Sequence, residues 1–211
     1  MAGSDPRDAA TLATGASVPK SSTGGRETPF LPSGSGCCGG ALTVFDEYGG
    51  GIWNGIEDHS VAFSVAWDPT TLYIGLKVVD DTHQLNGLSG WNGDSVQVVL
   101  ADDARSSVTH LYNYAIGADA GEHVTHHEHG TEAAITHCDQ LGGGATTNYE
   151  LKFPAACWGL ESLPAGAQAG IGLTINDGDT EAGQGGQKGW SGWGPYSAVY
   201  GKNAEECGLV A

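Results

Sequence analysis

Basic residues and long apolar runs are both scarce in this sequence. Lys and Arg number 8 against 25 for Asp and Glu, so the formal net charge of the 211 residues is -17. A surface this acidic repels phosphate backbones and anionic lipid headgroups, and we therefore expect neither a nucleic acid nor a membrane as partner. No stretch approaches the roughly 20 apolar residues of a membrane span, and residues 1–7 lack the apolar core of a signal peptide.

Helix-forming residues are sparse as well, and the 35 glycines argue against long amphipathic helices. Instead, 61–67 alternates with period two, turn residues follow at 68–71, and 72–79 runs back, which predicts a β-hairpin. Further strands are predicted at 95–100, 110–116, 124–128, 133–137, 147–153, 169–175 and 207–210, with one helical turn at 154–159. Short strands without interleaved helices predict an all-β fold, a two-sheet antiparallel β-sandwich of the immunoglobulin or jelly-roll type.

The composition changes near residue 41. Residues 1–40 are rich in Ser, Thr, Gly, Ala and Pro, so we interpret them as an irregular arm or linker, and 41–211 as the sandwich domain. The acidic, lysine-poor composition suits a secreted protein. We therefore expect an extracellular or cell-surface location, and interpret the chain as a piece of a longer protein.

Five cysteines are spread along the chain at Cys37, Cys38, Cys138, Cys157 and Cys207. Their spacing does not match a zinc site, and an adjacent pair suits two bridges that diverge from one loop. We expect two disulfides and one remaining thiol, as in an oxidising compartment; the alternative is a set of buried thiols.

Most tryptophans stand in Gly-, Asn- or Ser-rich contexts that indicate loops, namely Trp53, Trp91, Trp190 and Trp193. Trp67 and Trp158 stand in core-like contexts. An indole in a polar loop has no packing role unless it folds back or meets a ligand. Since a sugar ring presents an apolar C–H face on which an indole stacks, these rings are candidates for sugar binding. The alternative is that they close the ends of the sandwich core.

Acidic pairs occur in predicted turns at 80–81, at 102–103 and in the segment Asn176–Asp179. The last segment places oxygens around a glycine and resembles part of a calcium loop, although the distant Glu of such a loop is missing. We weigh a structural calcium site against simple Asx turns, which need no metal.

Histidines are concentrated in segment 121–130. If the segment is extended, His123, His127 and His129 share one face and form a candidate site for zinc, copper or nickel. We interpret the segment as a solvated loop and expect no transition metal there; a His-rich metal-binding protein or enzyme is the alternative. The sequence has no Gly-x-Ser-x-Gly, phosphate-loop or His-Glu-x-x-His motif, so we expect no enzyme.

Four blocks of sequence stand in a defined order. Residues 67–83 read Trp-Asp-Pro-Thr-Thr-Leu-Tyr-Ile-Gly-Leu-Lys-Val-Val-Asp-Asp-Thr-His, and 90–98 read Gly-Trp-Asn-Gly-Asp-Ser-Val-Gln-Val. Thr-Asn-Tyr-Glu-Leu-Lys-Phe-Pro follows at 147–154, and Ile-Asn-Asp-Gly-Asp at 175–179. In order and spacing these blocks together resemble family 9 carbohydrate-binding modules, over residues 41–211.

The resemblance implies a β-sandwich, one or more structural calcium ions, and a cleft in which two aromatic rings clamp a sugar. Trp91 falls where the family places one ring, and Tyr200 falls near the place of the second, with Trp190 or Trp193 as substitutes.

Two positions depart from the family pattern. Gln97 stands where sugar-binding members carry a Glu, and Leu111 stands where some carry an Arg, whereas Asn113 matches. A hydroxyl clamp built from charged groups is therefore weakened, and recognition of free sugar ends is in doubt.

The leading hypothesis is a noncatalytic glycan-binding module of a larger secreted protein. Trp91 and Tyr200 would stack on the sugar, Gln97, Asn113 and Asn176 would bind its hydroxyls, and Asp94, Asp177 and Asp179 would hold calcium. A different hypothesis is a structural domain of an extracellular fibre or surface coat. Such a domain would self-assemble by pairing the arm 1–40 with a neighbouring sheet edge.

Overall fold

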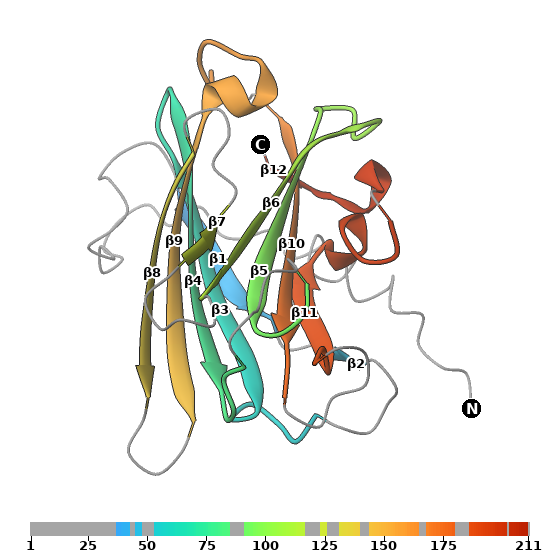
Figure 1. The fold of residues 1–211 in the computed structure, drawn as a ribbon. Coiled ribbons are helices and arrows are strands. Elements are labelled where there is room, and N and C mark those ends of the chain that lie inside the picture. Colours follow the sequence, from blue (N-terminus) through green and yellow to red (C-terminus); the bar gives the residue numbers. More distant parts are fainter. Residues whose placement is uncertain are drawn as a thin grey trace.

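The computed structural model describes residues 37–42, 45–47, 53–84, 91–116, 123–125, 131–139, 144–164, 168–179, 186–201 and 203–210. These residues form two antiparallel β-sheets packed face to face, joined by loops and three short 3-10 turns (Figure 1). The predicted all-β sandwich is thus confirmed. Within the described ranges, no helix is long and apolar enough to span a membrane.

One sheet has five strands in the order β1–β3–β4–β9–β8. These are β1 (Cys37–Leu42), β3 (His59–Trp67), β4 (Thr71–Asp80), β9 (Ala145–Pro154) and β8 (Glu132–Asp139). The hairpin predicted between 61 and 79 is β3–β4. Its turn is closed by Asp68, whose backbone N donates to the Thr71 carbonyl at 2.9 Å and whose carboxylate accepts from the Thr70 N at 2.7 Å. This is the Asx geometry that the turn residues predict.

The other sheet runs β2–β11–β10–β5–β6–β7, and β12 also pairs with β10. Its strands are β2 (Phe45–Glu47), β11 (Gly189–Trp193), β10 (Ala169–Asp177), β5 (Ser95–Ala101), β6 (Val108–Ile116), β7 (His123–Thr125) and β12 (Gly208–Val210). The interpretation of Trp190 and Trp193 as loop residues is wrong, because β11 pairs with β10 along Gly189–Trp193. The strands β1 and β2 were not predicted either.

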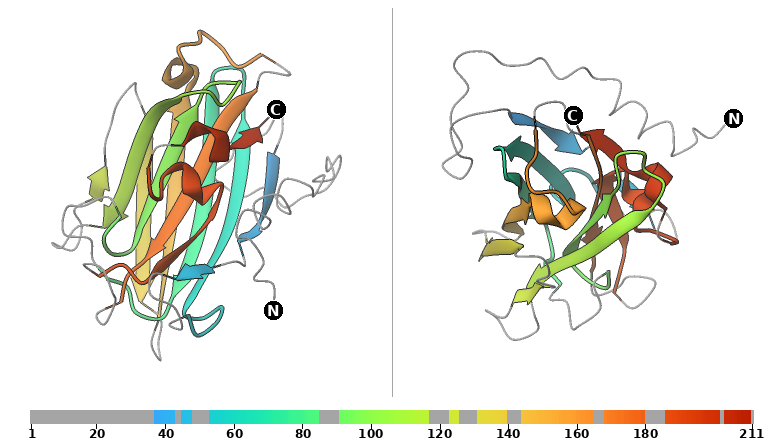
Figure 2. Two further views of the ribbon diagram at one scale, coloured as in Figure 1. Left: turned by 90° about the vertical axis from the view of Figure 1, so that its right-hand side faces the viewer. Right: turned by 90° about the horizontal axis from the view of Figure 1, so that it is seen from above.

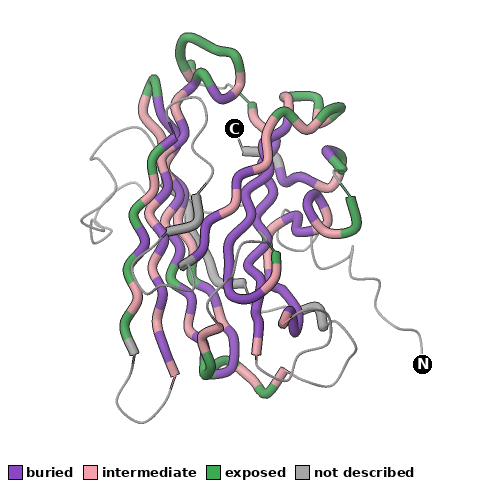
Figure 3. The backbone as a smooth tube through the Cα atoms, in the orientation of Figure 1, coloured by how far each residue is buried: buried purple, intermediate pink, exposed green. Residues whose placement is uncertain are grey.

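The core lies between the sheets and follows the period-two alternation of the strands (Figure 3). On β5 the inward side chains are Val96, Val98 and Leu100, and on β10 they are Ile171, Leu173 and Ile175, all at most 1% exposed. The predicted core tryptophans Trp67 and Trp158 pack against this cluster. The helical turn predicted at 154–159 is η1 (Ala155–Trp158).

The turns η2 (Pro195–Ser197) and η3 (Ala204–Glu206) follow β11 and lie against the outer face of the larger sheet (Figure 2). The Thr174 hydroxyl donates to the Pro195 carbonyl at 3.0 Å. A Cβ on Gly172 would lie 1.8 Å from the Ser197 Oγ, so this close approach requires a glycine on β10. The turns η2 and η3 therefore cover one end of the outer face of the larger sheet.

The cysteines depart from the expectation. Cys157 and Cys207 lie in two different apolar clusters, 0% and 1% exposed, and neither forms a disulfide. With two of the five cysteines excluded, at most one bridge can form, so the expectation of two disulfides is wrong. The physical reason is that both side chains fill apolar positions of the folded chain.

The predicted arm 1–40 falls mostly outside the described residues, which begin at Cys37. Strand β1 starts inside that segment and pairs with β3, so residues 37–40 belong to the sandwich. Self-assembly through the arm stays a prediction.

Candidate functional site

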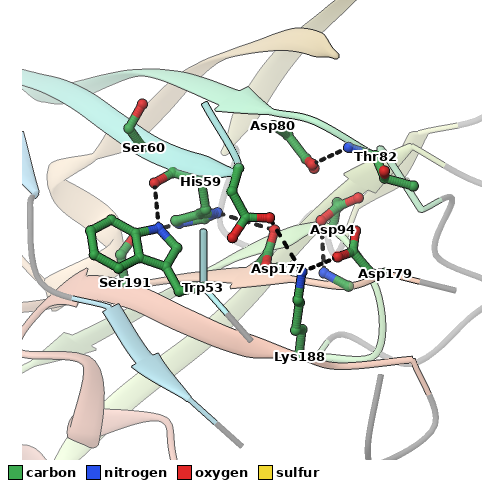
Figure 4. A network of polar contacts seen from close by, with 12 residues as sticks. Trp53, His59, Ser60, Asp80, Thr82, Asp94, Asp177, Asp179, Lys188 and Ser191 are labelled. Carbon is green, nitrogen blue, oxygen red and sulfur yellow. Dashed lines mark hydrogen bonds and ion pairs between the residues drawn. The ribbon is translucent and has the colours of Figure 1, made fainter. Parts of the chain in front are cut away.

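The inward alternation that builds the core continues into charged residues at the end of the sandwich opposite η1. His59 on β3, Asp80 on β4 and Asp177 on β10 follow the apolar inward positions of their strands, and Asp94 directly precedes β5. Their exposed fractions are 3%, 2%, 1% and 4%, respectively. We call Asp58, Asp80, Asp94, Asp177 and Asp179 the acidic layer; the last four are labelled in Figure 4. Carboxylates this deeply buried need compensating positive charge or protons.

Asp94 joins its own loop, which carries Trp91, to the loops that contain Gln84 and Gly178. Its Oδ1 accepts a hydrogen bond from the Gly178 backbone N at 2.9 Å, and its Oδ2 accepts one from the Gln84 backbone N. The loops approach so closely that a Cβ on Gly178 would lie 2.5 Å from the Gly93 Cα and 2.4 Å from the Gly186 carbonyl oxygen. The loop that carries Trp91 is therefore anchored to the acidic layer.

Lys188 supplies a buried positive charge to the layer. Its Nζ donates to Asp58 Oδ1 at 3.2 Å and to Asp179 Oδ2, and its side chain is 10% exposed (Figure 4). Burial alone would lower the pKa of this ammonium, but the hydrogen bonds to Asp179 and Asp58 outweigh it and raise the pKa. Lys188 thus neutralises one side of the layer.

Among the described residues, no Lys or Arg pairs with the other side of the layer, which we call the unneutralised side; its neighbours are the rings of His59 and His83. Asp80 Oδ2 and both carboxylate oxygens of Asp177 accept no hydrogen bond from the described residues. Burial, followed by repulsion from Asp177, raises the pKa of Asp80 from 3.8 to about 7. Burial, followed by repulsion from Asp80 and Asp177, also raises the pKa of Asp94. These directions indicate that the layer would favour an added cation or protons.

His59 connects the two sheets across the layer. Its Nε2 lies 2.8 Å from the Ser191 Oγ on β11, and its Nδ1 lies 3.4 Å from Asp177 Oδ1 on β10. The order Ser–His–Asp matches that of hydrolytic triads. Here, however, all three residues are at most 3% exposed, so a substrate cannot reach the hydroxyl. We interpret the contact as a polar link between the sheets.

The structure brings together two of the three predicted calcium ligands. Asp94 and Asp177 both belong to the unneutralised side of the layer, whereas Asp179 is paired with Lys188. Calcium binding by these three residues stays a prediction; Asp179 also lies in a separate carboxylate group with Asp58 and Asp81, whose oxygens are within 4.8 Å of one another. Sequence reasoning noticed Asp80 only as a turn residue and missed His83, although strand alternation from Val78 would have placed Asp80 inward.

The transition-metal site predicted in the histidine segment stays a prediction. Only the backbone of His123 is described, as the first residue of β7, and His127 and His129 lie outside the described residues.

A second polar cluster lies on the outer face of the larger sheet, across strands β6, β5 and β10. Gln97 Nε2 donates to Asn113 Oδ1 at 2.9 Å, and Gln187 Nε2 donates to Asn176 Oδ1 at 2.8 Å. Asn176 Nδ2 joins the two pairs by donating to Gln97 Oε1 at 3.5 Å. We call these four residues the amide row. The row unites the three predicted hydroxyl-binding residues and adds Gln187, which the sequence did not indicate.

Aromatic rings border the amide row. Trp190 stands directly opposite Asn176 in the β10–β11 register and is 3% exposed. Tyr200 packs edge-on against it, with ring centroids 5.9 Å apart, and is itself 79% exposed. Tyr200 adopts a left-handed φ of 58°, a strained conformation for a residue with a side chain. Trp91 is 44% exposed, in the loop that leads to Asp94.

One predicted residue does not reach this face. Trp193 faces the core, where it stacks on Phe63 with ring centroids 6.4 Å apart, so it leaves the set of ligand-binding candidates. Leu111, at the position of a charged residue in some sugar binders, shares the outer face of β6 with Asn113 but packs into the small apolar cluster that contains Val99.

The family model described as carbohydrate family 9 binding domain-like matches residues 40–210. Two solved structures of a carbohydrate binding module of family 9 from Caldicellulosiruptor kristjanssonii share the fold. The complex with cellotriose has 13% sequence identity and a TM-score of 0.53, covering 79% of this chain and 80% of the other. The complex with glucose also has 13% identity, with a TM-score of 0.51 and coverage of 79% and 82%. The search of curated proteins found no match.

Proposed function

Because the chain belongs to the carbohydrate family 9 binding domain-like family, we propose that it is a noncatalytic module that binds a neutral glycan on the outer face of the larger sheet. One observation carries the proposal: the amide row lies beside Trp190, on which the exposed ring of Tyr200 packs edge-on. Family membership supports binding rather than catalysis, and the geometry supports the location on this face.

The rings suit the apolar side of a sugar. At 79% and 44% exposure, Tyr200 and Trp91 present large apolar surfaces to solvent that no core contact requires. Each has a polar tip, a phenol or an indole N–H, that can bind a hydroxyl. The Trp190 ring packs edge-on against the Tyr200 ring and supports it from one side. Flat, amphipathic rings of this kind provide contact area at low entropic cost.

The amide row suits the hydroxyl groups of a sugar: Asn113 is partly exposed and is the member open to a hydroxyl, whereas Asn176 is 1% exposed and orders its neighbours. Its side chains are ordered by one another, because Gln97 is bonded to Asn113 and Asn176 to Gln187. Carboxamides donate and accept, as hydroxyls do, and a few fixed polar groups beside an apolar surface are typical of small-ligand sites.

The charges favour a neutral glycan over an anionic one. None of the four residues of the amide row is charged, and the whole chain carries a formal net charge of -17. Such a surface repels uronic acids and sulfated sugars. The two similar structures were solved with cellotriose and with glucose, both neutral.

The location proposed for the module is extracellular or on the cell surface. There a binding domain of this family would hold a larger protein against a polysaccharide. The fold by itself does not fix this role, so it depends on the family and on the site.

A glycan array with the full-length chain tests the proposal. The variant Trp91→Ala should lose binding by about 2 kcal/mol or more, roughly thirtyfold in Kd, as expected when a central aromatic contact is removed. Leu160→Ala is the matched control, because Leu160 is 43% exposed but lies beyond η1 at the other end of the sandwich. Binding that survives Trp91→Ala, or an array without any bound glycan, would count against the site.

A further inference from the structure

Three side chains converge on the unneutralised side of the acidic layer. The donor atoms of Asp80, His83 and Asp94 all lie within 4.8 Å of one another. His83 Nδ1 is 3.3 Å from Asp94 Oδ2 and 3.9 Å from Asp80 Oδ2. Ligands about 2.0–2.2 Å from a tetrahedral zinc ion are roughly 3.3–3.6 Å apart. The His83–Asp94 pair is therefore already at that spacing, and the His83–Asp80 pair needs a shift of a few tenths of an ångström.

One carboxylate oxygen of this group, Asp80 Oδ2, has no hydrogen-bond donor among the described residues. Asp80 is 2% exposed, and its Oδ1 accepts from the Thr82 backbone N at 2.8 Å, which fixes the carboxylate. Its Oδ2, on the side of His83, accepts no hydrogen bond from the described residues. A buried carboxylate oxygen without a donor is costly, and coordination to a cation would remove that cost.

The ligands are held in place by their neighbours. Both Asp94 oxygens accept backbone N–H groups, from Gly178 and Gln84. The His83 ring packs on the His137 ring, with centroids 4.3 Å apart, and His137 Nδ1 lies 2.9 Å from the Thr147 hydroxyl. Contacts of this kind orient the ligands of metal sites and are part of their affinity.

The chemistry of the set excludes the ion that the family resemblance implies. Calcium takes six to eight oxygen ligands, and a ring nitrogen is a poor substitute. Imidazole and carboxylate together suit zinc and similar divalent ions. Asp179, the oxygen ligand expected to complete a calcium set, is occupied by Lys188.

We propose that Asp80, His83 and Asp94 form a binding site for a divalent transition metal of the zinc class. The three protein ligands leave a fourth position for water. The metal ties the ends of β4 and β5 together and so fixes the loop that carries Trp91. The proposal does not depend on sugar binding.

The test uses full-length protein stripped of metal with a chelator. To remove the candidate ligands of the separate histidine segment, the starting protein carries His123→Gln, His127→Gln and His129→Gln. Equilibrium dialysis against zinc chloride and against calcium chloride should show one zinc bound per chain and no calcium of comparable affinity. His83→Gln should weaken zinc binding at least tenfold, whereas His110→Gln, the matched control, should not.

Two further measurements distinguish the proposal from its rivals. Cobalt(II) added to the stripped protein should give the visible absorption of a low-coordinate site, and this absorption should be lost in His83→Gln and in Asp80→Asn. Circular dichroism of each variant checks that it is folded. Calcium binding without zinc binding, or zinc binding unchanged in folded His83→Gln, would overturn the proposal. An absence of both metals would overturn it too.

Discussion

Replacing Lys188 with Met should be among the most destabilising single changes in this protein. The substitution keeps the hydrocarbon stem and removes the ammonium, which donates to Asp58 and Asp179. Asp58 is 3% exposed, and its Oδ2 stays bonded to the Asn54 backbone N at 2.5 Å, so it cannot turn to solvent without breaking that contact. Two carboxylates are then left in the layer without a counter-charge.

The magnitude follows from the burial of the pair. Removing one partner of a buried ion pair costs about 3–5 kcal/mol, because the remaining charge is left in a medium that solvates it poorly. For a chain of this size each kcal/mol lowers Tm by about 2–4 °C, so a decrease of roughly 6–20 °C is expected. The lower half of that range is the better expectation, since the Asp179 side chain is 15% exposed and retains some hydration.

Urea unfolding and calorimetry at neutral pH, with chelator present, measure the effect. Lys152→Met is the matched control: it breaks the pair with Glu132 at 2.7 Å, but the two side chains are 36% and 69% exposed. A surface pair of that kind contributes about 0–1 kcal/mol. Adding Asp179→Asn to Lys188→Met should restore part of the lost stability, because one uncompensated charge is removed.

The reasoning would be refuted by a Lys188→Met variant as stable as Lys152→Met. That result would mean that the carboxylates around Lys188 are protonated or hydrated in the folded protein, and that the ammonium adds nothing to them.

Three other changes have defined outcomes. In chelator, the raised pKa of Asp80, from 3.8 to about 7, means that the folded chain holds this proton more tightly than the unfolded chain. Stability should therefore fall by about 2–3 kcal/mol between pH 5 and pH 8, and a flat profile, or one unchanged in Asp80→Asn, would contradict this. Gly172→Ala should cost about 1–3 kcal/mol by pushing η2 away, since the new Cβ would lie 1.8 Å from the Ser197 Oγ; an unchanged urea midpoint would argue against that packing. Cys157 and Cys207 should react with a thiol reagent only after unfolding, because both are buried and burial raises the pKa of both thiols; labelling of either in the native protein would show that the clusters open.

Much of the fold is encoded locally. The alternation of 61–67 and 72–79, with an Asx turn between them, specifies the β3–β4 hairpin without any knowledge of its partners. Strand β11 was missed because Gly-Trp-Ser-Gly-Trp has neither β-branched residues nor a simple alternation. Its existence depends on pairing with β10, which is a tertiary contact.

The candidate sites likewise contain residues that the sequence indicates and residues that only the tertiary structure brings together. The amide row could be suspected from Gln97, Asn113 and Asn176 because the family resemblance supplied their alignment. Trp190 and Trp193 could not be separated, since only the register of β11 places one on the outer face and the other in the core. The acidic layer joins His59 to Asp177, residues that the sequence places far apart, and no local pattern predicts that contact.

The most direct test of the account is an NMR titration of the 15N-labelled chain with cellotriose. Sugar bound as proposed should shift the side-chain amide signals of Gln97, Asn113, Asn176 and Gln187 and the indole N–H signals of Trp91 and Trp190. Signals from the outer face of the smaller sheet, such as the side-chain amide of Asn148, should stay in place. Shifts confined to that smaller sheet would contradict the account, and so would saturation binding that leaves the amide row unchanged.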